Sequence, residues 1–293
     1  MAKTTFPKTE DKFNQWLVEQ YFIHGSVDEV FRQNKHSIPV SYANYQRILD
    51  KWGVVKAAGP NSKLTESLEF LSHLAYENVP FEKLYKKMPH SFKTSAVTLY
   101  RVLSYVKQGI TRRVGTALVI TPYNSDKNFL IGKDVSISRL EVGKPHGSLS
   151  LPMGYSNKLD SKKDSIRRVL QQEVFTKQTI NNQFPEIIIP NNPKPYMYLD
   201  IADVRVALYH LTLSKELSDS KHLSSFKLKN YRFENIKVTK SKDKRNYRAG
   251  VIEAINGYTK YLNLVARNLS VNPLQEKSIL NKEITSLVVE VEH

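Results

Sequence analysis

The chain has 293 residues, 40% hydrophobic and 25% charged, and its 44 Lys and Arg against 28 Asp and Glu give a formal net charge of +16. This length fits two or three domains, and the absence of cysteine excludes disulfides, thiolate metal sites and cysteine nucleophiles. No apolar run approaches the roughly 18 residues that span a bilayer, and the first residues lack the apolar region of a secretory signal. We therefore expect a cytoplasmic protein with no membrane partner.

The excess positive charge makes a polyanion the expected partner, because clustered Lys and Arg release counterions when they meet phosphates. Nucleic acid is the leading candidate, which predicts association with the nucleoid. A lysine-rich composition without any binding role is the alternative that charge alone leaves open.

Residues 1–110 contain short amphipathic helices that repeat after 54 residues. The segment SYANYQRILDKW (41–52) aligns with SAVTLYRVLSYV (95–106), and both place apolar residues at i, i+3, i+4 and i+7. Such a stripe indicates the same buried face on one helix of each copy. The repeat predicts two units of three helices each, residues 1–57 and 58–110.

Local signals mark the starts of these helices. Ser26 with Glu29 forms a capping box before the short second helix, and Pro80 supplies a first-turn proline in the second copy. Ser41 and Ser95 are natural N-caps for the third helices.

Tandem three-helix units on a basic chain resemble helix-turn-helix units of the homeodomain, Myb and resolvase kind. The resemblance implies that each third helix reads double-stranded DNA, with Asn, Gln and Arg on bases and the other polar residues on the backbone. The candidate DNA-binding residues face away from the apolar stripes: Tyr42, Asn44, Gln46, Arg47, Lys51, Thr98, Tyr100, Arg101, Tyr105 and Lys107. Residues 1–110 carry a net charge of only +5, so a protein-docking role or a solvated face stays open.

After Gln108 the pattern changes to short strands with two helices. Strands are expected at 115–122 and 129–133, a further strand group over 186–213, and a last helix over 249–269. This part, residues 111–269, is expected to form an α/β (α+β) domain with a mixed sheet. The tail, residues 270–293, has a turn signal and then a helix, and it ends in the strand-like ITSLVVEVEH, which is suited to pairing with a sheet edge.

The stretch GYSNKLDSKKDSIRRVLQQEVFT (154–176), preceded by LPMG, resembles the box of the Nudix hydrolase superfamily. That box is Gly, five residues, Glu, seven residues, then Arg-Glu-apolar-x-Glu-Glu-x-Gly-apolar. Gly154, Arg168, Leu170 and Glu173 stand at matching positions, and Asp160 stands for the first Glu. The surrounding elements follow the family's order over residues 112–269, about half the chain.

The box lacks most of the acids that hold Mg²⁺ in that family. Val169 replaces the Glu after Arg168, Gln172 replaces the first of the paired Glu, and the closing Gly and apolar residue are also missing. On a helix, Val169, Gln172 and Glu173 share one face, which the resemblance directs at the metal position. One carboxylate and one amide make a poor Mg²⁺ site, so we expect no catalytic residues and no resident cofactor or metal.

Two interpretations of the surviving box residues stay open. Arg168, Glu173 and Asp160 are expected to tie the helix to the preceding loop by ion pairing. In the alternative, Asp160 and Glu173 are Mg²⁺ ligands of a hydrolase that acts on nucleoside diphosphate derivatives.

The densest positive charge lies in FKLKNYRFENIKVTKSKDKRNYR (226–248), within a region, residues 111–267, of net charge +13. Its cations suit phosphates and its interleaved aromatics suit stacked bases, as in single-strand binders. The predicted basic patch comprises Lys227, Lys229, Arg232, Lys240, Lys242, Lys244, Arg245 and Arg248. A solvated loop between a strand and the last helix is the alternative.

The sequence thus predicts a multi-domain protein: an all-α tandem helix-turn-helix region followed by a degenerate Nudix-like domain. The expected function is a DNA-binding transcriptional regulator whose inactive domain senses a nucleotide-like effector or acts as a scaffold. A homodimer is one arrangement left open, and the hydrolase and protein-docking hypotheses stand as alternatives.

Overall fold

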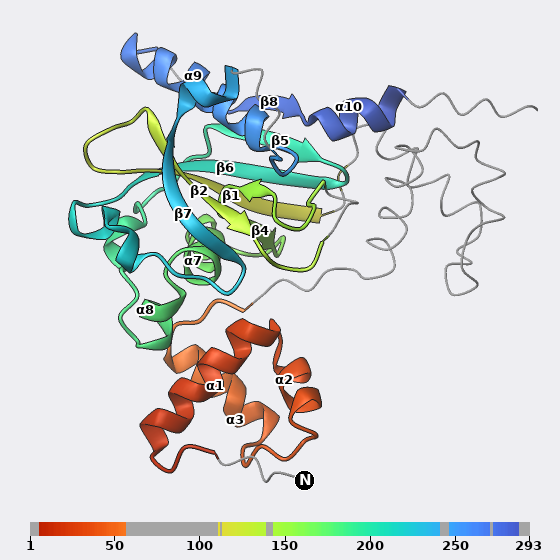
Figure 1. The fold of residues 1–293 in the computed structure, drawn as a ribbon, viewed down its shortest axis with the longest axis vertical. Helices are drawn as coiled ribbons and strands as arrows, with labels where there is room; N and C mark the ends of the chain where they lie inside the picture. The colour runs from red at the N-terminus through yellow and green to blue at the C-terminus, as the bar shows by residue number, and fades with distance from the viewer. Residues whose placement is uncertain are drawn as a thin grey trace, which may run out of the picture.

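A computed structural model describes residues 6–56, 111, 113–138, 143–240, 246–269 and 272–286. A bundle of three helices lies against a larger domain built on β-sheet (Figure 1). We call them the helical unit (residues 6–56) and the sheet domain (residues 113–286). The predicted second unit, residues 58–110, lies outside the described residues, and no helix in the described part is both long and apolar enough to cross a membrane.

Three helices form the helical unit: α1 (Glu10–His24), α2 (Val27–Gln33) and α3 (Tyr42–Lys51). The predicted N-caps are present, because the Ser26 hydroxyl accepts from the Glu29 N–H at 3.1 Å and the Ser41 hydroxyl from the Asn44 N–H at 3.2 Å. The predicted apolar stripe of the third helix is buried, and the hydroxyl of its Tyr45 donates to the Leu17 carbonyl at 2.5 Å.

The connection between α2 and α3 is longer than a tight helix-turn-helix turn. It spans residues 34–41, whereas that motif commonly joins its helices by three or four residues. Lys35 and His36 within it have positive φ angles of 49° and 56°. The three helices of the first unit are therefore observed, while their identity as a DNA-binding motif stays a prediction.

The described strands of the sheet domain form a larger mixed sheet, in the order β4-β1-β6-β5-β8, and a smaller antiparallel sheet, β3-β2-β7. Strand β1 pairs in parallel with β6 and antiparallel with β4, where Thr116 lies opposite Gly154 of the box. The strands are β1 (Arg113–Thr121), β2 (Asn128–Asp134), β3 (Leu149–Ser150), β4 (Met153–Ser156), β5 (Met197–Ile201), β6 (Val204–Thr212), β7 (Leu228–Asn235) and β8 (Leu274–Lys277).

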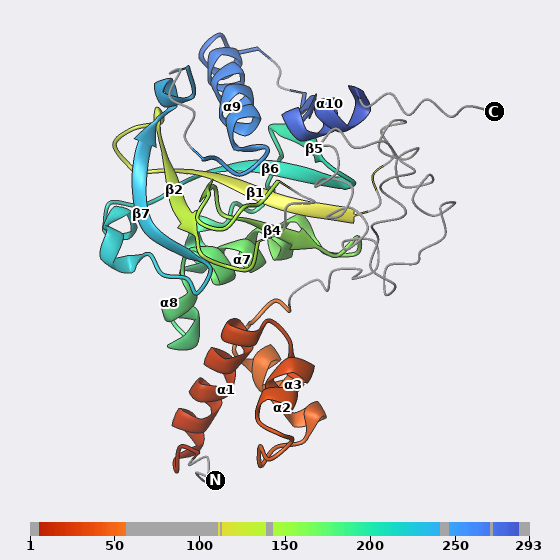
Figure 2. The ribbon, with the colours of Figure 1, turned by 45° about the vertical axis from the view of Figure 1, so that its right-hand side comes forward.

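Helices cover both faces of the larger sheet, with α7 on the side of the helical unit and α9 on the opposite side (Figures 1 and 2). Successive residues of β1 alternate between the two layers: Ala117 and Val119 join the core cluster of α9, Leu118 and Ile120 that of α7. The helices are α7 (Lys162–Glu173), α8 (Thr176–Ile180), α9 (Val251–Ala266) and α10 (Ile279–Ser286), with short 3-10 helices η3 (Glu186–Ile188), η4 (Glu216–Ser218), η5 (Ser220–His222) and η6 (Ile236–Lys240).

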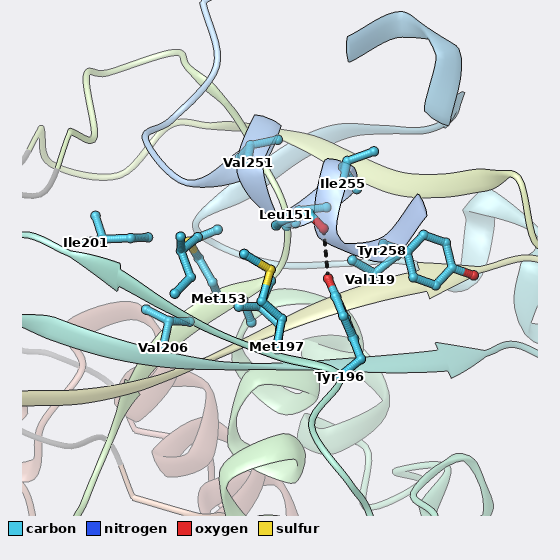
Figure 3. Packing of buried hydrophobic residues seen from close by; sticks show 14 of the residues in the cluster. Val119, Leu151, Met153, Tyr196, Met197, Ile201, Val206, Val251, Ile255 and Tyr258 are labelled. Carbon is cyan, nitrogen blue, oxygen red and sulfur yellow. Dashed lines mark hydrogen bonds between the residues drawn. The ribbon is translucent and has the colours of Figure 1, made fainter. Parts of the chain in front are cut away.

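Two buried tyrosines, in addition to apolar side chains, hold α9 against the sheet. Tyr196 and Tyr258 are buried with ring centroids 5.8 Å apart, and the Tyr196 hydroxyl donates to the Ala254 carbonyl at 3.1 Å (Figure 3). A buried hydroxyl needs a hydrogen-bond partner inside the core. The Tyr258 hydroxyl has one in His210 Nε2, at 3.1 Å.

Two predicted elements of the sheet domain differ in the structure. Residues 186–188 were expected to begin a strand group, but they form η3, because Pro185 and Pro190 flank them and proline cannot donate to a strand ladder. The basic stretch 226–248 contains strand β7, paired with β2, where only a loop was considered. Leu228 is buried and Tyr231 is half-buried there, whereas Lys229 and Arg232 are exposed, so the charged residues obscured the inward-facing positions of the strand.

The tail also differs in order from the prediction. An edge strand is present, but it is β8, which precedes helix α10 and pairs in parallel with β5. The first residues of ITSLVVEVEH belong to α10, and residues 287–293 lie outside the described part. Asn281 fixes the position of α10. Its side chain accepts a hydrogen bond from the Ala202 N–H and donates one to the Ala202 carbonyl, which holds the helix at the end of β5.

Candidate functional site

Arg168, Asp160 and Glu173 were expected to tie the box helix α7 to the preceding loop; Arg168 and Asp160 do so by an ion pair, whereas Glu173 contacts Lys227 instead. The Ser161 hydroxyl caps the helix by accepting from the Asp164 N–H at 3.1 Å. One turn later Arg168 Nη1 lies 2.5 Å from Asp160 Oδ2, and both side chains are largely buried. Burial opposes ionisation of Asp160, but hydrogen bonds from Arg168 and from the Asn157 N–H outweigh it and lower the pKa of that carboxyl. Asp160 is therefore placed as a partner of Arg168, away from Glu173.

The outer side of α7 binds the chain that leaves the helical unit, residues 53–56, which we call the tether. Gln171 is 1% exposed; its Nε2 donates to the Gly53 carbonyl at 2.7 Å, and its Oε1 accepts from the Val55 N–H at 2.9 Å. Arg168 Nε donates to the Lys56 carbonyl at 2.7 Å. Gln171 was not predicted, because an amide beside two other polar residues carries no sequence signal for a distant backbone partner.

The end of α7 opens into a cavity of about 850 Å³, which we call the box cleft. Its floor is Gly154, Gln172 and Glu173, and one wall comes from the end of α1, the turn that follows it and α2, including His24 and Arg32. The two units thus enclose it together, in the region where α1 and α2 approach the sheet domain (Figure 2).

A lysine faces the two box residues at the floor of the box cleft. Lys227 Nζ is 3.0 Å from Gln172 Oε1 and 3.4 Å from Glu173 Oε1. Burial raises the pKa of Glu173, and Lys227 counteracts that effect by favouring the carboxylate. The ammonium group therefore lies where these two oxygens would meet a metal ion.

Two more cations border the cleft around Asp134. Lys144 Nζ and Arg248 Nη1 lie 3.7 Å and 3.9 Å from Asp134 Oδ2, and the Ser136 N–H and hydroxyl donate to its other oxygen. Five Arg and Lys residues line the cleft against three carboxylates: Arg32, Lys144, Arg168, Lys227 and Arg248 against Glu29, Asp134 and Glu173. An anion is the ligand that this imbalance favours.

The residues of the box do not fit Mg²⁺. The ion needs several oxygen ligands, yet the box supplies only one carboxylate and one amide to the cleft, and both contact an ammonium group. Val169, predicted to share their face, is 1% exposed and packs in the core of α7, below Gly154. No group of three His, Cys, Asp or Glu within the described residues could hold a metal ion.

The predicted DNA-binding residues of the first unit lie on the outside of α3. Tyr42, Asn44, Arg47 and Lys51 are exposed, whereas Gln46 is half-buried. The charge of this face is partly balanced, since Asp50 pairs with Lys56 at 3.0 Å. The matching residues of the second unit, from Thr98 to Lys107, lie outside the described part of the chain.

The predicted basic patch divides among separate environments. Lys227 and Arg248 border the box cleft, and Lys229 lies in a second groove beside it. Arg232 pairs with Glu234 at 2.7 Å. The structure thus does not bring these four together. Lys240 ends η6, with no description of its side chain, and Lys242, Lys244 and Arg245 lie outside the described residues.

No protein-family model matches the chain, and no curated protein matches it either. Solved structures of Nudix hydrolases are similar to the sheet domain. The MutT protein from Methanosarcina mazei Go1 is 14% identical with a TM-score of 0.37, over 52% of this chain and 96% of its own. An ADP-ribose pyrophosphatase from Streptococcus suis 89-1591 is 13% identical with a TM-score of 0.36, over 57% of this chain and 99% of its own.

A third solved structure with this likeness is the Nudix domain of Shewanella oneidensis NrtR, in complex with ADP ribose. It is 10% identical with a TM-score of 0.34, over 54% of this chain and 97% of its own. At such identities and TM-scores, these likenesses establish neither family membership nor activity.

Proposed function

We propose that the protein is a DNA-binding transcriptional regulator whose Nudix-like domain is catalytically inactive and senses a nucleotide-like anion. The observation that carries the proposal is Lys227, which sets a fixed cation between Gln172 and Glu173 in a cleft walled by both units. A ligand in that cleft touches the sheet domain and the helical unit together.

The contacts of Lys227 support loss of the metal chemistry. Metal-assisted displacement at phosphorus needs a multivalent cation to activate water and to neutralise the developing charge. A lysine ammonium supplies one positive charge and hydrogen-bond donors, so it can hold a phosphate without generating a nucleophile. Binding without turnover is what a sensor requires.

The charges around the cleft support an anionic ligand. Lys144, Lys227 and Arg248 all lie within 3.9 Å of a carboxylate oxygen, at distances longer than those of a tight ion pair. An incoming diphosphate offers these cations more acceptor oxygens than Asp134 and Glu173 do. Half-exposed Tyr155, also on the cleft wall, is a surface for a base or sugar.

The position of the helical unit supports a regulatory output. Its α1–α2 turn lines the cleft, while Asn44, Arg47 and Lys51 on α3 stay exposed to a duplex. A ligand that draws the turn toward the sheet domain changes the position of α3 with it, because Tyr45 and Leu49 fix α3 within the bundle.

Sequence-specific DNA binding is tested by selection from a random duplex DNA pool at two salt concentrations. Each selection is done with and without ADP-ribose or inorganic pyrophosphate as the probe ligand. We expect an enriched sequence, a steep salt dependence, and a change in affinity when a probe is present. The variant Arg47→Ala is expected to reduce selectivity, whereas Lys158→Ala, on the sheet domain, leaves it unchanged. No enriched sequence at either salt concentration would overturn the regulator proposal.

A diphosphate hydrolysis assay addresses the alternative function in the same preparations. We expect no metal-dependent release of phosphate from ADP-ribose, and no effect of Glu173→Ala on that background. Turnover that needs Mg²⁺ and disappears in Glu173→Ala would establish the hydrolase instead.

A further inference from the structure

A second groove separates the helical unit from the sheet domain, beside the box cleft. It has a volume of about 860 Å³ and lies between α1 and the segment that runs from η5 into β7, with α8 between them. This size is within the range of ligand-binding cavities. We call it the side groove; the residues used below are Lys12, Trp16, Lys177, Phe226 and Lys229.

The side groove is basic. Three exposed lysines line it, one from each of its walls: Lys12 on α1, Lys177 on α8 and Lys229 on β7. Glu19 is the one acidic residue among those that line it in the described part of the chain. The charge is therefore complementary to a phosphate chain that contacts both units.

Aromatic rings stand on opposite walls of this basic groove. Trp16 comes from α1, where Phe13 stacks on it with ring centroids 5.8 Å apart and fixes its orientation. Phe226 comes from the sheet domain, 37% exposed, with Lys229 Nζ 5.9 Å from its ring centroid. Phe226 is exposed, and Trp16 is half-buried against Phe6 and Phe13 but still borders the groove; aromatic rings at the border of a basic groove are suited to stacking on nucleobases.

The side groove continues toward the box cleft. Phe226 borders both, and Lys227 and Lys229 from the same segment enter one each. A flexible strand could follow this path with bases on the rings and phosphates on the lysines. A duplex has its bases stacked and paired inside, and it offers no free base face to a ring within a groove.

We propose that the side groove binds single-stranded nucleic acid, with bases stacked on Trp16 and Phe226 and phosphates at Lys12, Lys177 and Lys229. This site is separate from the duplex-reading face proposed for α3 and from the anion at the box cleft. It also assigns a role to the positive charge of residues 226–229, for which duplex reading by α3 provides none.

The chain offers a direct optical test, because its two tryptophans are Trp16 and Trp52. In the full-length variant Trp52→Phe, Trp16 is the single tryptophan, and excitation at the red edge of tryptophan absorption avoids the sixteen tyrosines. Titration with dT12 and with rU12 at low salt should quench its fluorescence, and affinity should fall steeply as salt is raised. The two oligonucleotides distinguish a preference for DNA from one for RNA.

Matched variants locate the site. The triple variant Lys12→Gln/Lys177→Gln/Lys229→Gln, and separately Phe226→Leu, should each weaken binding about tenfold or more. The control triple Lys158→Gln/Lys194→Gln/Lys215→Gln removes the same charge from exposed lysines that line neither cavity, and it should change affinity far less.

Three outcomes would overturn the proposal: no quenching at low salt, equal losses in both triple variants, or displacement of the strand by an equimolar duplex of the same length. None depends on whether duplex selection succeeds. Circular dichroism of each variant confirms that a loss of binding is not a loss of folding.

Discussion

The helical unit and the sheet domain differ most in charge. Residues 1–56 contain eight Lys and Arg against six Asp and Glu, whereas residues 111–267 contain 27 against 14. The helical unit is thus nearly neutral, and the sheet domain is strongly basic. The difference teaches that the excess positive charge of the chain lies in the sheet domain, while the helical unit contributes mainly walls to the two cavities.

The largest expected effect comes from a substitution at the contact between the helical unit and the sheet domain. We expect Arg168→Ala to destabilise the protein by about 3 kcal/mol, because it leaves Asp160 as an uncompensated, largely buried carboxylate. It also removes the donor to the Lys56 carbonyl of the tether. The measurement is urea unfolding followed by fluorescence, since both tryptophans are in the helical unit.

Its neighbour Arg167 is the matched control. That side chain is 29% exposed and pairs with Glu186, itself 55% exposed, so Arg167→Ala should cost less than about 1 kcal/mol. Equal effects of the two substitutions would mean that the contact with the tether contributes nothing specific.

The amide of Gln171 tests the same contact between α7 and the tether through hydrogen bonds alone. Gln171→Leu keeps the bulk of the side chain but leaves the Gly53 carbonyl and the Val55 N–H without their partner, which we expect to cost about 2 kcal/mol. Hydrogen exchange at Val55 should quicken as well. Exposed Gln183 provides the control, and an unchanged exchange rate at Val55 in Gln171→Leu would show that the tether is not held by α7.

Acid should weaken the sheet domain through His210. Burial lowers the pKa of His210 to about 4, while the unfolded chain takes up its proton near 6.5. Stability is therefore full above about pH 6.5 and is lost as the pH falls toward 4, by about 2 kcal/mol at pH 5. Urea unfolding at pH 7 and pH 5 measures this loss.

The variant His210→Gln isolates that contribution from the carboxylates. Its free energy of unfolding should fall less between pH 7 and pH 5 than that of the unmodified protein. A pH dependence identical in both would show that the pKa of His210 is the same in the folded and the unfolded chain.

The smallest expected effect concerns the helix caps of the helical unit. Ser41→Ala removes the acceptor for the Asn44 N–H at the start of α3 and should cost about 1 kcal/mol. Ser26→Ala should cost a similar amount at α2, because the same bond is made to Glu29. If neither substitution moves the tryptophan-detected transition, the two caps contribute nothing measurable to the stability of the helical unit.

Local signals explain what the sequence predicted correctly. The helix starts at Ser26 and Ser41, the stripe of α3, strands β1 and β2, and the Arg168–Asp160 pair all depend on residues close in sequence. Val169 was misplaced because helix spacing cannot tell the cleft side of a helix from its core side when the two adjoin.

The rest depends on contacts between distant segments. The approach of Lys227 to Glu173 and the bonds of Gln171 to the tether arise only when the units are packed together. The charge density of the sequence identified the segment that contains Lys227, but it could not predict which carboxylate or amide each cation contacts. Residues that work across a domain boundary therefore escape prediction from composition and spacing.

The most direct test of the account is calorimetric titration of the full-length protein with inorganic pyrophosphate, with EDTA and with Mg²⁺, for the unmodified chain and for Lys227→Gln. We predict binding that persists in EDTA and weakens about tenfold or more when Lys227 loses its charge. Binding that appears only with Mg²⁺, or that is unaffected by Lys227→Gln, would contradict the claim that a lysine has taken the place of the metal.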